Sequence, residues 1–259
     1  MVKGYRYIVI LVWLVMLTGC EVIRESERLI EVPIAVDSSE RRHLLVEYTG
    51  FRCVNCPKAA EAAAALQDVY GEQLIVVSMH PASNPFTQGA AQYDYTCPAA
   101  DVYYQYMGGT ATTPFPTGNV DLVKQENGWL SDYTEWPALL AKRINMPAEV
   151  HMTAHKNELT MFAEQAQTCQ LAIWLVEDSV QGVQAMPDGS VDKQYYHRHV
   201  LRGTVGDPWG ETISVGQQQT KHTVHIEIPE GCDPKHCSAV AVLLNEKREV
   251  LNAIELNEL

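Results

Sequence analysis

The sequence has few basic residues, no internal repeat and no low-complexity tract. Only 19 lysines and arginines stand against 32 acidic residues, which gives a formal net charge of −13. A nucleic-acid-binding protein needs a basic footprint for its phosphate contacts, so this balance excludes that class of partner. Hydrophobic residues make up 46% of the chain. That share is typical of a folded globular protein and excludes general disorder.

Long apolar runs are also lacking, except near the N-terminus. Residues 8–17 are almost wholly apolar and follow Lys3 and Arg6. This run is shorter than the roughly 20 residues that a membrane-spanning helix needs. A short basic segment, an apolar run of this length and small residues before a cleavage point are typical of an export signal. We therefore interpret residues 1–19 as a signal peptide.

The signal ends in Leu17-Thr18-Gly19-Cys20, which resembles the lipobox of bacterial lipoproteins. The resemblance implies cleavage before Cys20 and lipid modification of that residue, so the lipid would be its membrane partner. Glu21 stands in place of the aspartate that commonly retains such proteins at the inner membrane, which favours the outer membrane. An ordinary signal peptide with an incidental cysteine is the alternative. Residues 20–36 are expected to form a polar, lipidated tether.

Residues 37–146 alternate between strand and helix patterns, which predicts an α/β domain. An apolar strand is expected at His43–Tyr48, an alanine-rich helix at residues 57–70 and a buried strand at residues 73–79. Residues 81–113 are expected to be an insertion with a helix near its end. A strand at residues 117–123 and a helix at residues 136–144 complete the pattern.

After residue 146 only short strand-like runs appear, separated by turn signals such as Pro187-Asp188-Gly189. No long helix fits this part of the sequence. The pattern predicts that residues 147–259 form an all-β, immunoglobulin-like sandwich. The expected strands cover residues 149–154, 170–176, 220–228, 238–244 and 249–254.

Seven cysteines are too few for a small disulfide scaffold, but Cys53-Val54-Asn55-Cys56 has a chemically specific position. It follows a predicted strand and opens a predicted helix. Free N–H groups and the helix dipole favour a thiolate there, so Cys53 could attack a disulfide and Cys56 could resolve the mixed disulfide. A zinc site would need a second Cys/His pair at matching spacing. None is present, so no metal is expected.

The strand–CxxC–helix segment resembles the thioredoxin superfamily. The resemblance implies that Glu47, six residues before Cys53, is a buried carboxylate that transfers a proton to and from Cys56. It also implies that Pro116 is the cis-proline facing the cysteines, although Pro114 is an alternative. Arg52, where that superfamily usually has an aromatic residue, departs from the pattern.

The lipobox, residues 45–57 and residues 174–211 together resemble the twenty-eight-kilodalton outer-membrane lipoprotein family of Bacteroidetes. The second segment is the more specific and includes Trp174-Leu175-Val176-Glu177-Asp178 and Tyr195-Tyr196-His197-Arg198-His199. The resemblance covers most of residues 20–259. It implies an outer-membrane lipoprotein with a thioredoxin-like domain followed by a β-sandwich, and no established activity.

The other cysteines allow several pairings. Cys232 and Cys237 enclose an Asp-Pro turn, which permits a disulfide. Cys97 and Cys169 could pair with each other or remain buried as small apolar side chains.

Two functions therefore stay open. The first is thiol–disulfide exchange with exported proteins, without a cofactor, through Cys53, Cys56, Glu47 and Pro116. The second is a non-catalytic surface module that binds a partner or assists assembly. A redox site needs an accessible sulfur, whereas a structural disulfide can be buried.

Overall fold

The computed structural model describes residues 41–89 and 94–256. The expected signal peptide, the lipidation site Cys20 and the tether lie outside these ranges. None of the helices in the described ranges combines the length and hydrophobicity that a transmembrane segment requires. The contacts gather Asp37–Leu259 into one compact unit.

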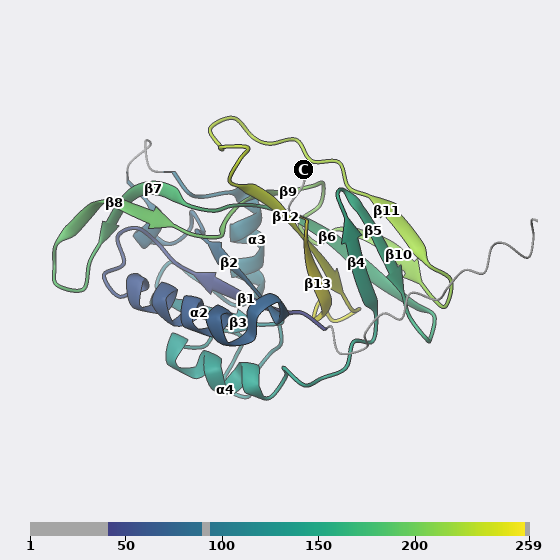
Figure 1. Ribbon diagram of the computed structural model, residues 1–259. Coiled ribbons are helices and arrows are strands. Elements are labelled where there is room, and N and C mark those ends of the chain that lie inside the picture. Colours follow the sequence, from purple (N-terminus) through teal and green to yellow (C-terminus); the bar gives the residue numbers. More distant parts are fainter. Residues whose placement is uncertain (1–40, 90–93, 257–259) are drawn as a thin grey trace, which may run out of the picture. The chain divides into compact units, whose positions relative to one another are not determined.

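A parallel β-α-β unit forms the first part of this compact unit (Figure 1). Strand β1 (His43–Tyr48) leads to helix α2 (Cys56–Tyr70), a 3-10 turn at Gly71–Gln73 and strand β2 (Leu74–Met79). Every residue of the two strands is buried, which explains their continuous apolar sequence. Helix α2 has a proline in its first turn and ends at Gly71, whose φ of 55° suits glycine.

The chain then passes to the other face of the sheet and returns as a strand antiparallel to β1. A 3-10 turn at Pro85–Thr87 and helix α3 (Pro98–Tyr106) precede strand β3 (Thr117–Val120), which pairs antiparallel with β1. A bridge between Gly118 and Ser131, a 3-10 turn at Tyr133–Glu135 and helix α4 (Trp136–Ala141) follow. A parallel β-α-β unit followed by an antiparallel strand and a helix is a thioredoxin-like arrangement.

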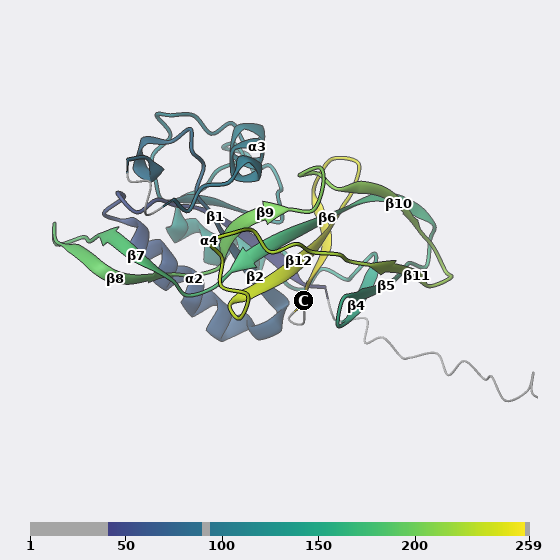
Figure 2. The same cartoon turned by 90° about the horizontal axis from the view of Figure 1, so that it is seen from above.

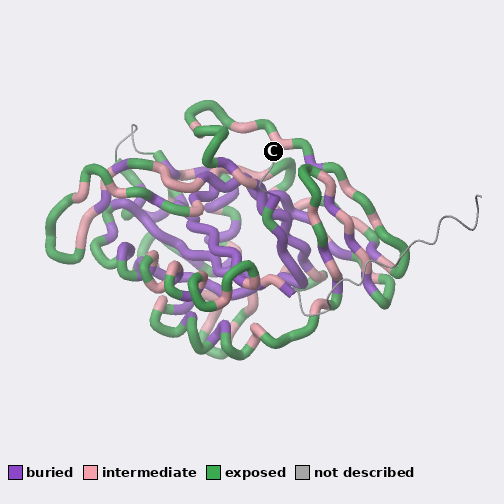
Figure 3. Tube along the Cα trace, viewed as in Figure 1, coloured by how far each residue is buried: buried purple, intermediate pink, exposed green. Residues whose placement is uncertain are grey.

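Helices cover both faces of this sheet. Figure 2 shows α2 and α3 on opposite sides of the strands. On one side, Leu45 and Val76 pack with Trp136 of α4 and with the alanines of α2. On the other side, Val46 and Val77 pack with Tyr103 and Tyr104 of α3. Alternate residues of each strand therefore belong to different layers of the core. Figure 3 shows that the central strands are buried.

After residue 146, the described part of the chain contains strands and loops and no helix. The strands are β4 (His151–His155), β5 (Glu158–Phe162), β6 (Gln167–Glu177), β7 (Val180–Ala185), β8 (Val191–His197), β9 (Val200–Thr204), β10 (Glu211–Val215), β11 (Thr220–Thr223), β12 (Cys237–Leu244) and β13 (Val250–Leu256). Strands β4, β5 and β11 form a three-stranded sheet. Met152, Leu159 and Met161 of this sheet pack against alternate residues of β6, β12 and β13, so this part is sandwich-like.

One eight-stranded sheet runs through both parts of the chain. Its order is β13-β12-β6-β9-β2-β1-β3, with β10 also paired to β6. Strand β9 makes the connection, because Val200 pairs with Ser78 and the Ser78 N–H donates to the His199 carbonyl at 2.8 Å. Residue 146 is therefore no boundary between sheets. The division into two domains, the second immunoglobulin-like, remains a prediction.

The individual strands differ from expectation mainly after residue 146. The strand expected at residues 220–228 ends at Thr223, and the alternating Val224, Ile226 and Ile228 lie beyond it. No strand was expected at β5, nor was the hairpin of β7 and β8. These two strands pair with each other as a separate two-stranded sheet. This hairpin matters for the site because it lies over the end of β1 and the start of α2.

Candidate functional site

The two cysteines of the CxxC motif form a disulfide at the start of α2. Cys56 is the first residue of the helix, and Cys53 lies in the turn that joins it to β1. Their Cα atoms are 5.4 Å apart. The predicted placement between a buried strand and a helix N-terminus is thus present. Both residues are only 2% exposed, so neither lies open to solvent.

Glu47 lies behind the disulfide, on β1 and opposite Ser78 of β2. The carboxyl is 2% exposed, and the Ser78 hydroxyl donates to Oε2 at 3.5 Å. Burial raises the pKa of Glu47 to about 8, and the Ser78 hydrogen bond offsets only part of that effect. Its Oε1 has no hydrogen-bond partner among the described residues. A carboxyl with this pKa can accept and release a proton near neutral pH.

A cavity of about 190 Å³ joins Glu47 to Cys56. Helix α2 supplies one wall, the ends of β1 and β2 supply another, and the β7–β8 hairpin closes the third side. Its polar lining includes Ser78, His80, Gln184 and His197. The predicted proton-transfer group and the predicted resolving cysteine therefore line one common cavity.

Pro116 lies on the other side of the motif. The Phe115–Pro116 peptide bond is cis, which selects Pro116 over Pro114. A groove of about 520 Å³ is lined by Asn55, by the proline loop at residues 113–117 and by residues 130–133.

The β7–β8 hairpin covers the motif from outside. The Gln184 side chain donates from Nε2 to the Cys53 carbonyl at 2.9 Å, and Gln184 is 2% exposed. The neighbouring Ala185 N–H donates to the Phe51 carbonyl at 2.8 Å. These two contacts fix the hairpin on the turn that contains Cys53. They explain why a CxxC at a helix N-terminus is buried here.

Sequence reasoning did not find His80, Ser78 or the role of Gln184. His80 follows β2 and has the same parity as Ser78, so strand alternation places both on the face that contains Glu47. That alternation was a usable signal for His80 and Ser78. Gln184 acts on a residue 131 positions away, for which a single sequence carries no signal.

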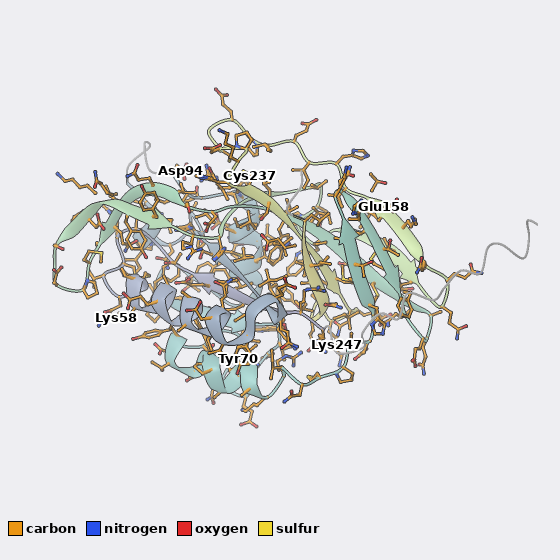
Figure 4. All side chains as sticks on the ribbon, viewed as in Figure 1. Lys58, Tyr70, Asp94, Glu158, Cys237 and Lys247 are labelled. Atoms are coloured by element: carbon orange, nitrogen blue, oxygen red, sulfur yellow. A yellow bond between two sulfur atoms is a disulfide. The ribbon has the colours of Figure 1, made fainter. Side chains whose placement is uncertain are left out.

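The other four cysteines of the described ranges are free thiols. Cys97 and Cys169 are buried in different core clusters and do not pair with each other. Cys237 begins β12 (Figure 4), and Cys232 lies five residues before it. The ligand atoms of these two cysteines and of Glu177 lie within 4.8 Å of one another. No bond joins the two sulfurs, and their disulfide remains a prediction for the oxidised protein.

The Glu177–Cys232–Cys237 cluster contains a positive charge. Arg202 Nε lies 3.3 Å from the Cys232 sulfur and 3.3 Å from Glu177 Oε2. The guanidinium therefore already neutralises the groups that would attract a cation. We assign no metal to this cluster.

The fold and the buried CxxC define a thioredoxin-like protein whose motif is covered by its own chain. Residues 100–256 match the family described as outer membrane protein Omp28. The chain belongs to this family, which confirms the resemblance drawn from the sequence and is consistent with a location at the outer membrane.

The first two of three similar solved structures support the fold. HBP35 of Porphyromonas gingivalis is similar with a TM-score of 0.59 and 15% identity, over 83% of this chain and 74% of that one. A protein of Agrobacterium tumefaciens is similar with a TM-score of 0.52 and 10% identity, over 83% and 93%. A domain of the outer membrane lipoprotein Omp28 from P. gingivalis has 18% identity over 42% and 87%, with a TM-score of 0.27. No curated protein matches the sequence.

Proposed function

We propose that this protein is an outer-membrane lipoprotein, anchored through Cys20, that exchanges thiols and disulfides with exported polypeptides through Cys53 and Cys56. The observation that carries the proposal is the cavity shared by Glu47 and Cys56. A purely structural disulfide has no need of a buried carboxyl with a pKa of about 8 beside it. The groove at Pro116 supports an extended polypeptide as the substrate.

The chemistry follows from the order of the groups. In the reduced protein, the Cys53 thiolate attacks a substrate disulfide, and one substrate sulfur leaves as a thiolate that takes a proton from solvent. Cys56 then gives its proton to the Glu47 carboxylate and attacks the Cys53 sulfur. The mixed disulfide breaks, the second substrate sulfur leaves as a thiolate, and the Cys53–Cys56 disulfide forms. The substrate is reduced and the protein is oxidised.

The reduction potential of the Cys53–Cys56 pair tests this proposal. The intact chain in detergent would be equilibrated in glutathione buffers, and each thiol would be mapped by mass spectrometry. We expect a value between about −120 and −270 mV, the range of known exchange proteins. A value below about −300 mV is typical of a structural disulfide and would contradict the proposal.

The burial of both sulfurs favours a second candidate, a binding or assembly module in which the disulfide only stabilises the fold. The two candidates differ in what the hairpin does. If the disulfide reacts with substrates, the hairpin must move away from Cys53 during each reaction. If it is structural, the hairpin contact is permanent.

We expect Gln184→Ala to accelerate reduction of the Cys53–Cys56 disulfide by a small thiol. The substitution removes the hydrogen bond to the Cys53 carbonyl, worth about 1 kcal/mol, so opening becomes roughly fivefold more frequent. The measurement is the rate of reduction by dithiothreitol, followed by trapping of the new thiols. Gln181→Ala, at an exposed position of the same strand, is the matched control. Equal rates in both variants and the wild type would favour the structural candidate.

A further inference from the structure

His80 is the most deeply buried titratable group in the cavity that the chemistry above does not use. It is 1% exposed and follows the end of β2. Neither of its ring nitrogens has a hydrogen-bond partner among the described residues, and the side chain lines the same cavity as Glu47 and Cys56. A buried imidazole normally engages at least one nitrogen, so two free nitrogens on a side chain that lines a cavity require an explanation.

The position of His80 relates it directly to Glu47. Glu47 pairs with Ser78 across the parallel strands, and His80 lies two residues further along the same strand direction. Alternation places Ser78 and His80 on the face that Glu47 also occupies. His80 is therefore the next titratable group beyond Glu47 along the wall of the cavity.

Glu47 needs a route for its proton. It is 2% exposed, and its hydrogen bond from Ser78 leaves Oε1 without a partner among the described residues. After it takes the proton of Cys56, the carboxyl must lose that proton before it can act again. The cavity also reaches half-exposed or exposed side chains, including Glu61, Tyr196 and His199, so it offers a path outward.

We propose that His80 is the relay through which Glu47 exchanges its proton with solvent, an inference that rests on the proposed function. One ring nitrogen accepts the proton of the Glu47 carboxyl while the other nitrogen releases its own proton toward the open side of the cavity. The imidazole changes tautomer, so the ring stays neutral, and the negative charge that remains is the Glu47 carboxylate, ready to accept the next proton. His80 acts through Glu47 and does not touch the sulfurs.

The groups around His80 favour a neutral ring. His197 of β8 lies with its ring centroid 5.8 Å away, and Tyr95 lies at 5.4 Å. Burial, followed by the nearby His197 and the positive charge of Arg202, holds the pKa of His80 well below its usual value. The other titratable groups that line the cavity are Glu47, Cys56, Glu61, Tyr195, Tyr196, Arg198 and His199. A neutral imidazole can accept and donate at once, as a relay requires.

His197 provides a matched comparison within the same cavity. It is 5% exposed, and burial lowers its pKa to about 4, although its hydrogen bond to a backbone carbonyl acts in the opposite direction. That bond joins Nε2 to the Val183 carbonyl at 3.1 Å. One nitrogen of His197 is therefore engaged, which leaves it less suited to pass a proton.

The test follows the Glu47 proton itself. The intact chain in detergent, reduced and freed of reductant, would be mixed with heavy water while infrared spectroscopy records the carbonyl stretch of protonated carboxyls. The band that disappears in Glu47→Gln identifies Glu47. We expect His80→Ala and His80→Gln to slow deuterium exchange of this band by roughly a hundredfold. His197→Gln should stay within about twofold of the wild type, since it lies outside the relay.

Chemical rescue separates a relay from a structural role. Imidazole added to His80→Ala should restore the exchange rate, whereas pyrrole, which has no basic nitrogen, should not. Unchanged exchange in both His80 variants, or a slowed rate that imidazole does not restore in a folded variant, would overturn the relay. Single-turnover reduction of a protein disulfide by the same samples would separate the two proposals. The deuterium exchange of the Glu47 band could depend on His80 in a chain that reduces no protein disulfide. That result would contradict only the proposed function.

Discussion

Replacing Cys53 by serine is expected to lower the reduction of a protein disulfide to the uncatalysed background. The helix N-terminus favours a thiolate at Cys53, and a serine hydroxyl stays protonated there and cannot attack a disulfide. The measurement is the rate at which the reduced, intact chain reduces insulin disulfides in single-turnover experiments. Undiminished exchange in this variant would contradict the assignment of Cys53 as the nucleophile.

The companion variant Cys56→Ser should behave differently. Attack by Cys53 remains available, but no thiol can resolve the product, so a mixed disulfide with the substrate should accumulate. Mass spectrometry would detect the covalent adduct at Cys53. Cys169→Ser is the control, because Cys169 is a buried free thiol in the sandwich-like core. This variant should exchange at the wild-type rate and form no adduct.

The largest expected loss of stability comes from Asp121→Asn. Asp121 lies directly after β3 and is fully buried. Its carboxylate contacts Arg143 Nε at 2.6 Å and His43 Nδ1 at 2.7 Å, and it accepts from the Leu44 N–H at 2.9 Å. Arg41 lies 3.7 Å away. An asparagine leaves Arg41 and Arg143 without their counter-charge in the core, which should cost about 3–5 kcal/mol in the free energy of unfolding.

The same residue predicts a dependence on pH. Burial alone would raise the pKa of Asp121, but the hydrogen bond and charge of His43 and the charge of Arg143 hold it below its usual value. In the unfolded chain, an aspartate has a pKa of about 3.9. Its contribution to stability is therefore fully present above that pH and is lost as the pH falls through the lower folded pKa.

Chemical denaturation at several pH values would measure this contribution. Between neutral pH and acid, the wild type should lose stability more steeply than Asp121→Asn, which lacks the titrating group. Asp68→Asn, at an exposed position on α2, should match the wild type at every pH. If the stability of Asp121→Asn falls with pH as steeply as that of the wild type, groups other than Asp121 dominate the loss of stability in acid.

Local patterns predicted the first half of the fold well. The strand at His43–Tyr48 has the expected bounds, and α2 begins one residue before the expected helix. Continuous apolar runs, a proline in the first turn and a glycine at the end are local signals, so they can be read without knowledge of the tertiary structure. Cys53, Cys56 and Glu47 follow from their positions relative to these elements.

The rest depended on contacts between residues far apart in the sequence. Strand β9 extends the sheet at β2 although more than a hundred residues separate Ser78 from Val200. Its sequence, VLRGT, contains a glycine and an arginine and shows no clear alternation. The hairpin over Cys53 is also non-local. The sequence could therefore predict the position of the CxxC pair but could not predict that the chain buries it.

The pairing of β9 with β2 has a consequence for how this chain can be divided. A fragment ending at residue 146 would retain the CxxC motif, α2 and the proline loop, but it would lose the strand beside β2. The N–H of Ser78 would then have no carbonyl from His199 to bind. An uncovered parallel edge rich in valine and isoleucine is a template for pairing with other chains. The second half of the protein thus also protects the first half from aggregation.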